Sequence, residues 1–256
     1  MFKAIRILLL LLLLIFVAGT TWLTQARSTD WEDTLWIRVY PMTGDGSESS
    51  QRYVDALDIR QFSGIEEFFA TEVAKYGRNL ARPVRVELGN PVTGQPPALP
   101  PATNVFQIMW WSMRMRWWAG SVTSGDDGPR PDVRMFVRYF DPDTDLSLDN
   151  SVGLQKGMIG IVNAYASRRQ DGTNNVIVAH EFLHTLGATD KYDTATGLPA
   201  FPDGFAEPAR EPRYPQRYAE IMGGRIPLAD DDAAVPQNLD FALIGPQTAR
   251  EIRLTE

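Results

Sequence analysis

The chain of 256 residues contains no cysteine and only two histidines. Without cysteine there can be no disulfide, no thiolate nucleophile and no cysteine-bound zinc or iron–sulfur cluster. Any bound metal ion must therefore be held by histidine, aspartate or glutamate. Because His180 and His184 lie within five residues of sequence, all imidazole chemistry is confined to that short segment.

Positive charge is also in short supply. Apart from Lys3 and Arg6, 23 basic residues stand against 32 acidic ones, which argues against nucleic acid as a partner. The overall composition, 44% apolar and 22% charged, is that of a folded globular protein and excludes disorder as the main state.

A long apolar run lies at the N-terminus. Lys3 and Arg6 precede an uninterrupted apolar stretch at residues 7–18, a pattern typical of an export signal. Residues 1–27 are therefore expected to be either a cleaved signal peptide or an N-terminal signal anchor, whose residues 7–23 would contact the membrane. Both alternatives place the rest of the chain outside the cytoplasm, as a secreted, periplasmic or outward-facing anchored protein.

The remaining residues, 28–256, predict one domain of the α/β class. Apolar patterning predicts strands at residues 34–40, 83–88, 132–140 and 157–165. Helical spacing predicts helices at residues 64–76, 104–118, 174–186 and 238–252, the last with a break at Gly245-Pro246. Proline and glycine predict loops at residues 89–101 and 120–131. The succession of strand, helix and strand indicates a mixed sheet covered by helices.

The predicted helix at residues 104–118 contains four tryptophans together with Arg114 and Arg116. We expect its apolar residues to pack in the core and along a cleft. The alternative is a membrane-interface face, because tryptophan prefers that boundary.

An aspartate-rich segment follows the third predicted strand, and its oxygen density is compatible with a Ca²⁺ ion. Its members are Asp141, Asp143, Asp145 and Asp149. An EF-hand is excluded, because Leu146 replaces the required glycine and Val152 the terminal glutamate. A solvated acidic loop is the preferred interpretation.

The segment at residues 174–186 reads NNVIVAHEFLHTL and predicts a largely buried helix, capped by Thr173 or Asn174. On this helix His180 and His184 are one turn apart and point the same way, so that both can bind one zinc ion. Glu181 lies beside them, close enough to reach a metal-bound water without being a ligand. By itself this H-E-x-x-H pattern is also compatible with two histidines that merely pack or face solvent.

The residues after His184 extend the pattern. Gly187 can adopt the left-handed conformation that ends a helix and reverses the chain. That reversal can return Asp190 to the metal as a third ligand and leave the fourth position for water. Further on, Met222 lies in a glycine-assisted turn, Glu220-Ile-Met-Gly-Gly224.

Together, H-E-x-x-H-x-x-G-x-x-D and the later methionine resemble the metzincin zinc endopeptidases. The variant resembled has aspartate as its third ligand, as in snapalysin-like and immune-inhibitor-A-like peptidases, and the resemblance covers residues 176–224. It implies a mixed twisted sheet packed on an active-site helix, with a mostly irregular and helical C-terminal subdomain. The roles it implies are zinc ligation by His180, His184 and Asp190, general-base catalysis by Glu181, and a Met222 floor beneath the metal.

Two tyrosines and three glutamates near the pattern leave alternatives open. Tyr192 and Tyr218 could each stabilise an oxyanion or serve as a fifth metal ligand, although packing with an exposed hydroxyl is the simpler interpretation for both. A zinc class with a downstream glutamate as third ligand would instead need one of Glu207, Glu211 and Glu220.

The expected function is that of an exported or membrane-anchored zinc endopeptidase, which hydrolyses peptide bonds in a protein or peptide substrate by Glu181-assisted attack of a zinc-bound water. The alternative is a catalytically silent cell-envelope binding protein that keeps the metallopeptidase fold.

Overall fold

The computed structural model describes residue 6 and residues 28–98, 100, 104–126, 128–144, 148 and 151–255. The expected signal segment at residues 1–27, apart from Arg6, lies outside the described residues, and so do Asp145 and Asp149. Within the described ranges, no helix is both long and apolar enough to cross a membrane.

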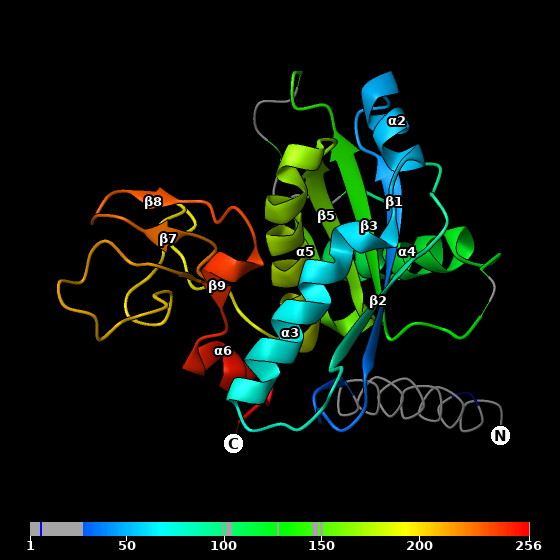
Figure 1. The fold of residues 1–256 in the computed structure, drawn as a ribbon. Helices are drawn as coiled ribbons and strands as arrows, with labels where there is room; N and C mark the ends of the chain where they lie inside the picture. The colour runs from blue at the N-terminus through cyan, green and yellow to red at the C-terminus, as the bar shows by residue number, and fades with distance from the viewer. Residues whose placement is uncertain are drawn as a thin grey trace.

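A five-stranded mixed sheet forms the centre of the fold, with the strand order β2-β1-β3-β5-β4 (Figure 1). Four strands run parallel, and the short β4 pairs antiparallel with β5 at one edge. The strands are β1 (Leu35–Thr43), β2 (Val84–Leu88), β3 (Val133–Phe140), β4 (Val152–Leu154) and β5 (Ile159–Tyr165). The four parallel strands match the predicted ones, whereas the sequence pattern did not predict β4.

Helices cover both faces of the sheet, as the α/β prediction requires (Figure 1). Helices α3 (Ser63–Lys75) and α5 (Asp171–Leu186) pack on one face, where Phe69 and Phe182 meet edge to face. Helix α4 (Val105–Val122) packs on the other face. Shorter helices are α2 (Glu48–Asp55) and the 3-10 turns η1 (Ile59–Phe62), η2 (Gln155–Gly157) and η3 (Arg168–Gln170).

Helix α5 begins at Asp171, three residues before the predicted start, and the expected cap is wrong. Neither Thr173 nor Asn174 caps it, because both side chains bond neighbouring segments. The Thr173 hydroxyl donates to the carbonyl of Pro236 at 3.2 Å. The Asn174 amide accepts from the Tyr165 N–H and donates to the Tyr165 carbonyl, at 3.1 and 2.9 Å. These two residues therefore attach the helix to its surroundings.

The C-terminal part of the chain is mostly irregular and lies beside α5 (Figure 1). Its elements are β6 (Ala219–Glu220), β7 (Ile226–Pro227), β8 (Ala233–Ala234), η4 (Leu239–Phe241), β9 (Ala242–Leu243) and α6 (Pro246–Glu251). The prediction of a broken helix at residues 238–252 is correct only for α6. Before it, Leu239–Phe241 form the turn η4 and Ala242–Leu243 pair with β6, and Pro246 then starts the helix.

The buried carboxylate of Glu220 holds this subdomain together. One oxygen accepts the backbone N–H groups of Met222 and Gly223 at 2.7 and 2.9 Å. The other accepts the Gly245 N–H at 3.0 Å and the Thr248 hydroxyl at 2.7 Å. Burial raises the pKa of Glu220, and these donors act in the opposite direction. The carboxylate thereby joins the turn at Met222 to helix α6.

Replacement of Glu220 by alanine is expected to lower the free energy of unfolding by at least about 3 kcal/mol, because it leaves several buried donors without an acceptor, each at about 1–3 kcal/mol. Denaturant titration of Glu220→Ala beside the parent measures the loss. Glu211→Ala, at an exposed position, is the matched control and should change stability by less than about 0.5 kcal/mol. Equal losses in both variants would contradict the role assigned to Glu220.

Candidate metal centre

Helix α5 brings the two histidines together as their spacing predicts. The Nε2 atoms of His180 and His184 lie 3.1 Å apart, and both rings are largely buried with a small exposed edge. The carboxylate of Glu181 belongs to the same group, since one donor atom from each of the three residues lies within 4.8 Å of the others.

Gly187 ends α5 in the left-handed conformation expected of it, with φ of 110°. The N–H of Gly187 bonds the His184 carbonyl and the N–H of Ala188 bonds the Leu183 carbonyl, both at 3.1 Å, which closes the last turn. The reversed chain then places Asp190 Oδ1 3.1 Å from His180 Nε2 and 3.0 Å from His184 Nε2.

The opposite ring nitrogens settle which way the imidazoles are protonated. His180 Nδ1 lies 2.8 Å from the carbonyl oxygen of Ile221, and His184 Nδ1 lies 2.8 Å from that of Ala188. A carbonyl oxygen only accepts, so both Nδ1 atoms carry hydrogen. In the neutral rings, both Nε2 atoms then present lone pairs to each other and to the Asp190 carboxylate. Three acceptor atoms converge, and a cation between them, either a shared proton or a metal ion, relieves their repulsion.

The triangle of acceptor atoms fits a metal ion. Bonds of about 2.0–2.2 Å around a tetrahedral ion separate the ligand atoms by about 3.3–3.6 Å, close to the observed separations of 3.0–3.1 Å. The donor set of two imidazoles and one carboxylate suits zinc and other first-row transition metals. The carbonyl partners at Nδ1 are the kind of outer contact that orients metal-binding histidines.

Close contacts shift the charges of these groups. Burial acts to raise the pKa of Asp190, but interactions with His180 and His184, which donate to the carboxylate whenever an Nε2 atom carries a proton, outweigh burial and hold that pKa well below its ordinary value. Burial likewise acts to lower the pKa of His184, and the contact with Asp190 raises it. Asp190 is therefore a carboxylate at neutral pH, the form that binds a metal ion.

Glu181 is buried beside this triangle, and its Oε2 atom has no hydrogen-bond partner among the described residues. Burial is the largest influence on Glu181 and raises its pKa, while the neighbouring histidines and a hydrogen bond from the Gly153 backbone lower it. A buried carboxylate with one unused oxygen is ready to accept a proton from a molecule in the site.

Gly153, in the edge strand β4, is a contributor to the site that the sequence did not reveal. A side-chain carbon at this position would lie 2.5 Å from His184 Cβ and 2.6 Å from the Glu181 carbonyl oxygen. Only glycine therefore allows β4 to approach the helix this closely. A single glycine after an acidic loop gives no signal of that contact.

Met222 is fully buried in the turn below α5. Its carbonyl oxygen accepts the Lys191 N–H at 2.9 Å, and the preceding residue, Ile221, accepts from His180. The turn is thus bonded directly both to a histidine of the site and to the residue that follows Asp190.

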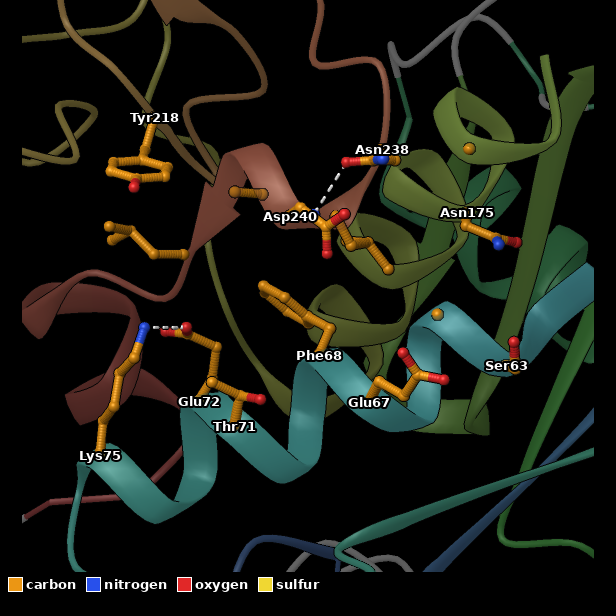
Figure 2. Close-up of a pocket in the computed structure, with 15 residues that line it drawn as sticks. Ser63, Glu67, Phe68, Thr71, Glu72, Lys75, Asn175, Tyr218, Asn238 and Asp240 are labelled. Carbon is orange, nitrogen blue, oxygen red and sulfur yellow. Dashed lines mark hydrogen bonds and ion pairs between the residues drawn. The ribbon is translucent and has the colours of Figure 1, made fainter. Parts of the chain in front are cut away.

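The two tyrosines lie in different surroundings. The ring of Tyr192 is centred 6.3 Å from that of His180, and burial together with the negative charge of Asp190 raises the pKa of Tyr192 to about 12. Tyr218 instead lines a pocket of about 580 Å³ between α3 and residues 238–243 (Figure 2). None of the four residues His180, Glu181, His184 and Asp190 lines that pocket.

None of the alternative glutamate ligands joins the histidines in the group that could hold a metal ion among the described residues. Glu207 pairs with Arg217, Glu220 is saturated by its four donors, and Glu211 is exposed. The carboxylate brought to the histidines is therefore that of Asp190.

The aspartate-rich segment is described only in part. Asp141 accepts the Ser49 hydroxyl at 2.5 Å and the Asp143 N–H at 2.9 Å, and these bonds lower its pKa. The observed contacts are those of a hydrogen-bonded loop, and Asp145 and Asp149 lie outside the described residues.

No protein-family model matches the chain, and no curated protein gives a significant match.

Asp190→Ala is expected to abolish binding of a divalent transition metal, since it removes one of the three converging donors. Each purified variant is dialysed against buffer that contains trace zinc, and its metal content is then measured by elemental analysis. Glu207→Ala removes a carboxylate of the same subdomain outside the triangle and should keep the parent's metal content. Retained metal in Asp190→Ala would exclude Asp190 as a ligand.

Substitutions of Met222 are expected to act according to size. Met222→Leu nearly conserves volume and should cost less than about 1.5 kcal/mol. Met222→Ala leaves a cavity and should cost roughly 2–5 kcal/mol, with a lower melting temperature and weaker metal retention. The melting temperatures of both variants are compared with that of the parent. If Met222→Ala melts at the parent's temperature, Met222 does not support the packing beneath the histidines.

Proposed function

We propose that the protein is a zinc-dependent endopeptidase of the metzincin type that acts outside the cytoplasm, either exported or anchored to a membrane. The observation that carries the proposal is the convergence of His180 Nε2, His184 Nε2 and Asp190 Oδ1 beside a buried carboxylate with an unused oxygen. A purely structural histidine pair has no need of Glu181 in that position.

When bound to the triangle, a zinc ion would supply Lewis-acid chemistry that makes water more acidic and polarises a carbonyl group. Glu181 would take the proton of the attacking water and pass it to the nitrogen of the leaving amine. Burial, which raises the pKa of Glu181, suits this role, because a carboxylate with a higher pKa is a stronger base toward the water proton. With both Nε2 atoms bound to the metal ion, neither histidine would be available as a separate base for a serine or threonine nucleophile.

Tyr192 is the second candidate for direct contact with the substrate. Its hydroxyl keeps its hydrogen at neutral pH, because its pKa is about 12, and it lies beside Asp190. A protonated hydroxyl there can donate to the negative charge that develops on a carbonyl oxygen during hydrolysis.

The edge strand β4 supports a peptide as substrate. It is the last strand in the sheet order, and its Gly153 touches both Glu181 and His184. An extended peptide that pairs with such an edge is held through its own backbone groups, largely independently of side chains. This placement would bring a peptide bond next to Glu181.

The arrangement of the layers is compatible with the metzincin resemblance. Helix α5 packs on a five-stranded mixed sheet, and a mostly irregular subdomain with the turn at Met222 follows it (Figure 1). The metal-binding geometry supports a metal site, and the metzincin resemblance is what assigns that site to a peptide hydrolase.

Glu181→Gln is expected to lower peptide cleavage by about 10²- to 10⁴-fold, the usual contribution of a general base, while stoichiometric zinc stays bound. Cleavage of a mixed peptide library, read by mass spectrometry, and zinc content are measured on the same samples. Glu67→Gln, an exposed carboxylate of α3, is the matched control and should match the parent in both.

The outcomes separate the alternatives. Zinc lost from Glu181→Gln would make Glu181 a ligand and contradict its role as base. A parent chain that binds zinc and cleaves no peptide in the library would favour the silent binding protein.

A further inference from the structure

Helix α4 is apolar on two opposite faces, and the sheet covers only one of them. Trp111 (6% exposed), Met115 and Ala119 face the sheet, where they pack with Phe136. The outer face carries large apolar side chains on successive turns: Phe106 (79% exposed), Trp110 (62%), Met113 (57%) and Trp117 (77%). At 100° per residue, these side chains point away from the buried set.

This arrangement corrects the expectation that the segment packs in the core and along a cleft. The expectation of core packing holds for Trp111 and, in part, for Trp118, whose ring centre lies 4.7 Å from that of Phe136. It is wrong for Trp110 and Trp117. Large exposed apolar patches on soluble domains mark sites of interaction.

The chain segment that forms the outer face carries few charges. Between residues 88 and 125 the only charged side chains are Arg114 and Arg116, although the whole chain has a formal charge of -7. Both arginines are exposed, and the helical repeat places them on either side of the apolar stripe. An apolar stripe between two arginines is complementary to a surface that is apolar inside and negatively charged outside.

We propose that α4 lies flat on an anionic lipid bilayer, with Phe106, Trp110, Met113 and Trp117 in the interfacial layer and the arginines at the phosphate groups. Tryptophan and phenylalanine favour this depth, and arginine reaches from it to the headgroups. A twofold contact between two copies of α4 fits less well, because it would bring the arginine-flanked faces of both copies together.

The placement also suits the candidate metal centre. Helices α4 and α5 cover opposite faces of the sheet (Figure 1), so a bilayer on the outer side of α4 leaves the side of His180 and His184 open to solvent. The domain would lie on the membrane and still admit a soluble peptide.

The absence of native cysteine permits a site-specific test on the full chain. In Met113→Cys, an environment-sensitive nitrobenzoxadiazole label is attached to the outer face of α4. In the control Thr71→Cys, the same label is attached to an exposed position of α3, on the opposite side of the sheet. Both proteins are mixed with phosphatidylcholine vesicles, with and without phosphatidylglycerol, that contain a spin-labelled quencher lipid. We expect quenching at position 113 to exceed that at position 71 several-fold and to increase with phosphatidylglycerol.

A second pair of variants assigns the effect to the exposed rings. Trp110→Ser with Trp117→Ser should reduce quenching at position 113 to the level of position 71. Both residues are exposed, so the thermal melt should stay that of the parent. Phe201→Ser removes an exposed ring from the C-terminal subdomain and should leave the quenching unchanged.

Three results would overturn the proposal. These are equal lipid quenching at positions 113 and 71, quenching that survives the double tryptophan substitution, and energy transfer between labelled copies without lipid quenching. The last result would mean that a second copy covers the face.

Discussion

Two imidazoles direct their Nε2 lone pairs at one carboxylate oxygen because their Nδ1 atoms are already engaged. The carbonyls of Ile221 and Ala188 hold the Nδ1 protons and so turn both Nε2 atoms toward Asp190. A cation between them would relieve the repulsion of these atoms, and the surrounding segments keep the three groups in place. Helix α5 supplies the histidines, the turn at Gly187 returns the carboxylate, and the turn at Met222 orients His180. The geometry of the site therefore depends on the fold of the C-terminal subdomain.

Hydrogen bonds to the residues on either side of Asp190 hold its carboxylate in place. Glu251 of α6 accepts the N–H and the hydroxyl of Thr189, at 2.9 and 2.8 Å, and the ammonium of buried Lys191 at 2.7 Å. Asp190 thus lies between two residues that α6 fixes. Helix α6 in turn is tied to the turn at Met222 by Glu220. Ion pairs and hydrogen bonds of this kind contribute more to geometry than to net stability, since burial of charge costs about as much as pairing returns. These contacts keep Asp190 at the position where the two imidazoles meet.

Sequence reasoning succeeds where spacing along the chain decides the structure. The separation of His180 and His184 fixes one helical face, and Gly187 marks the reversal, because both effects act within one or two turns. It fails where contacts come from distant segments. The donors to Glu220 come from two stretches about 25 residues apart, and the value of Gly153 depends on a strand that touches α5 only in the folded chain. In α4 the periodicity is ambiguous, because both faces are apolar and the sequence does not say which one the sheet covers.

The most direct test of the metal centre is zinc-edge X-ray absorption on the purified chain, combined with elemental analysis. We predict one zinc ion per chain, with two imidazole nitrogens and at least one oxygen at about 2.0–2.2 Å. Because the chain contains only two histidines, the imidazole signal can come only from His180 and His184. A chain that retains no zinc, or a zinc ion surrounded by oxygen atoms alone, would contradict the assignment of the convergent triangle as a metal site.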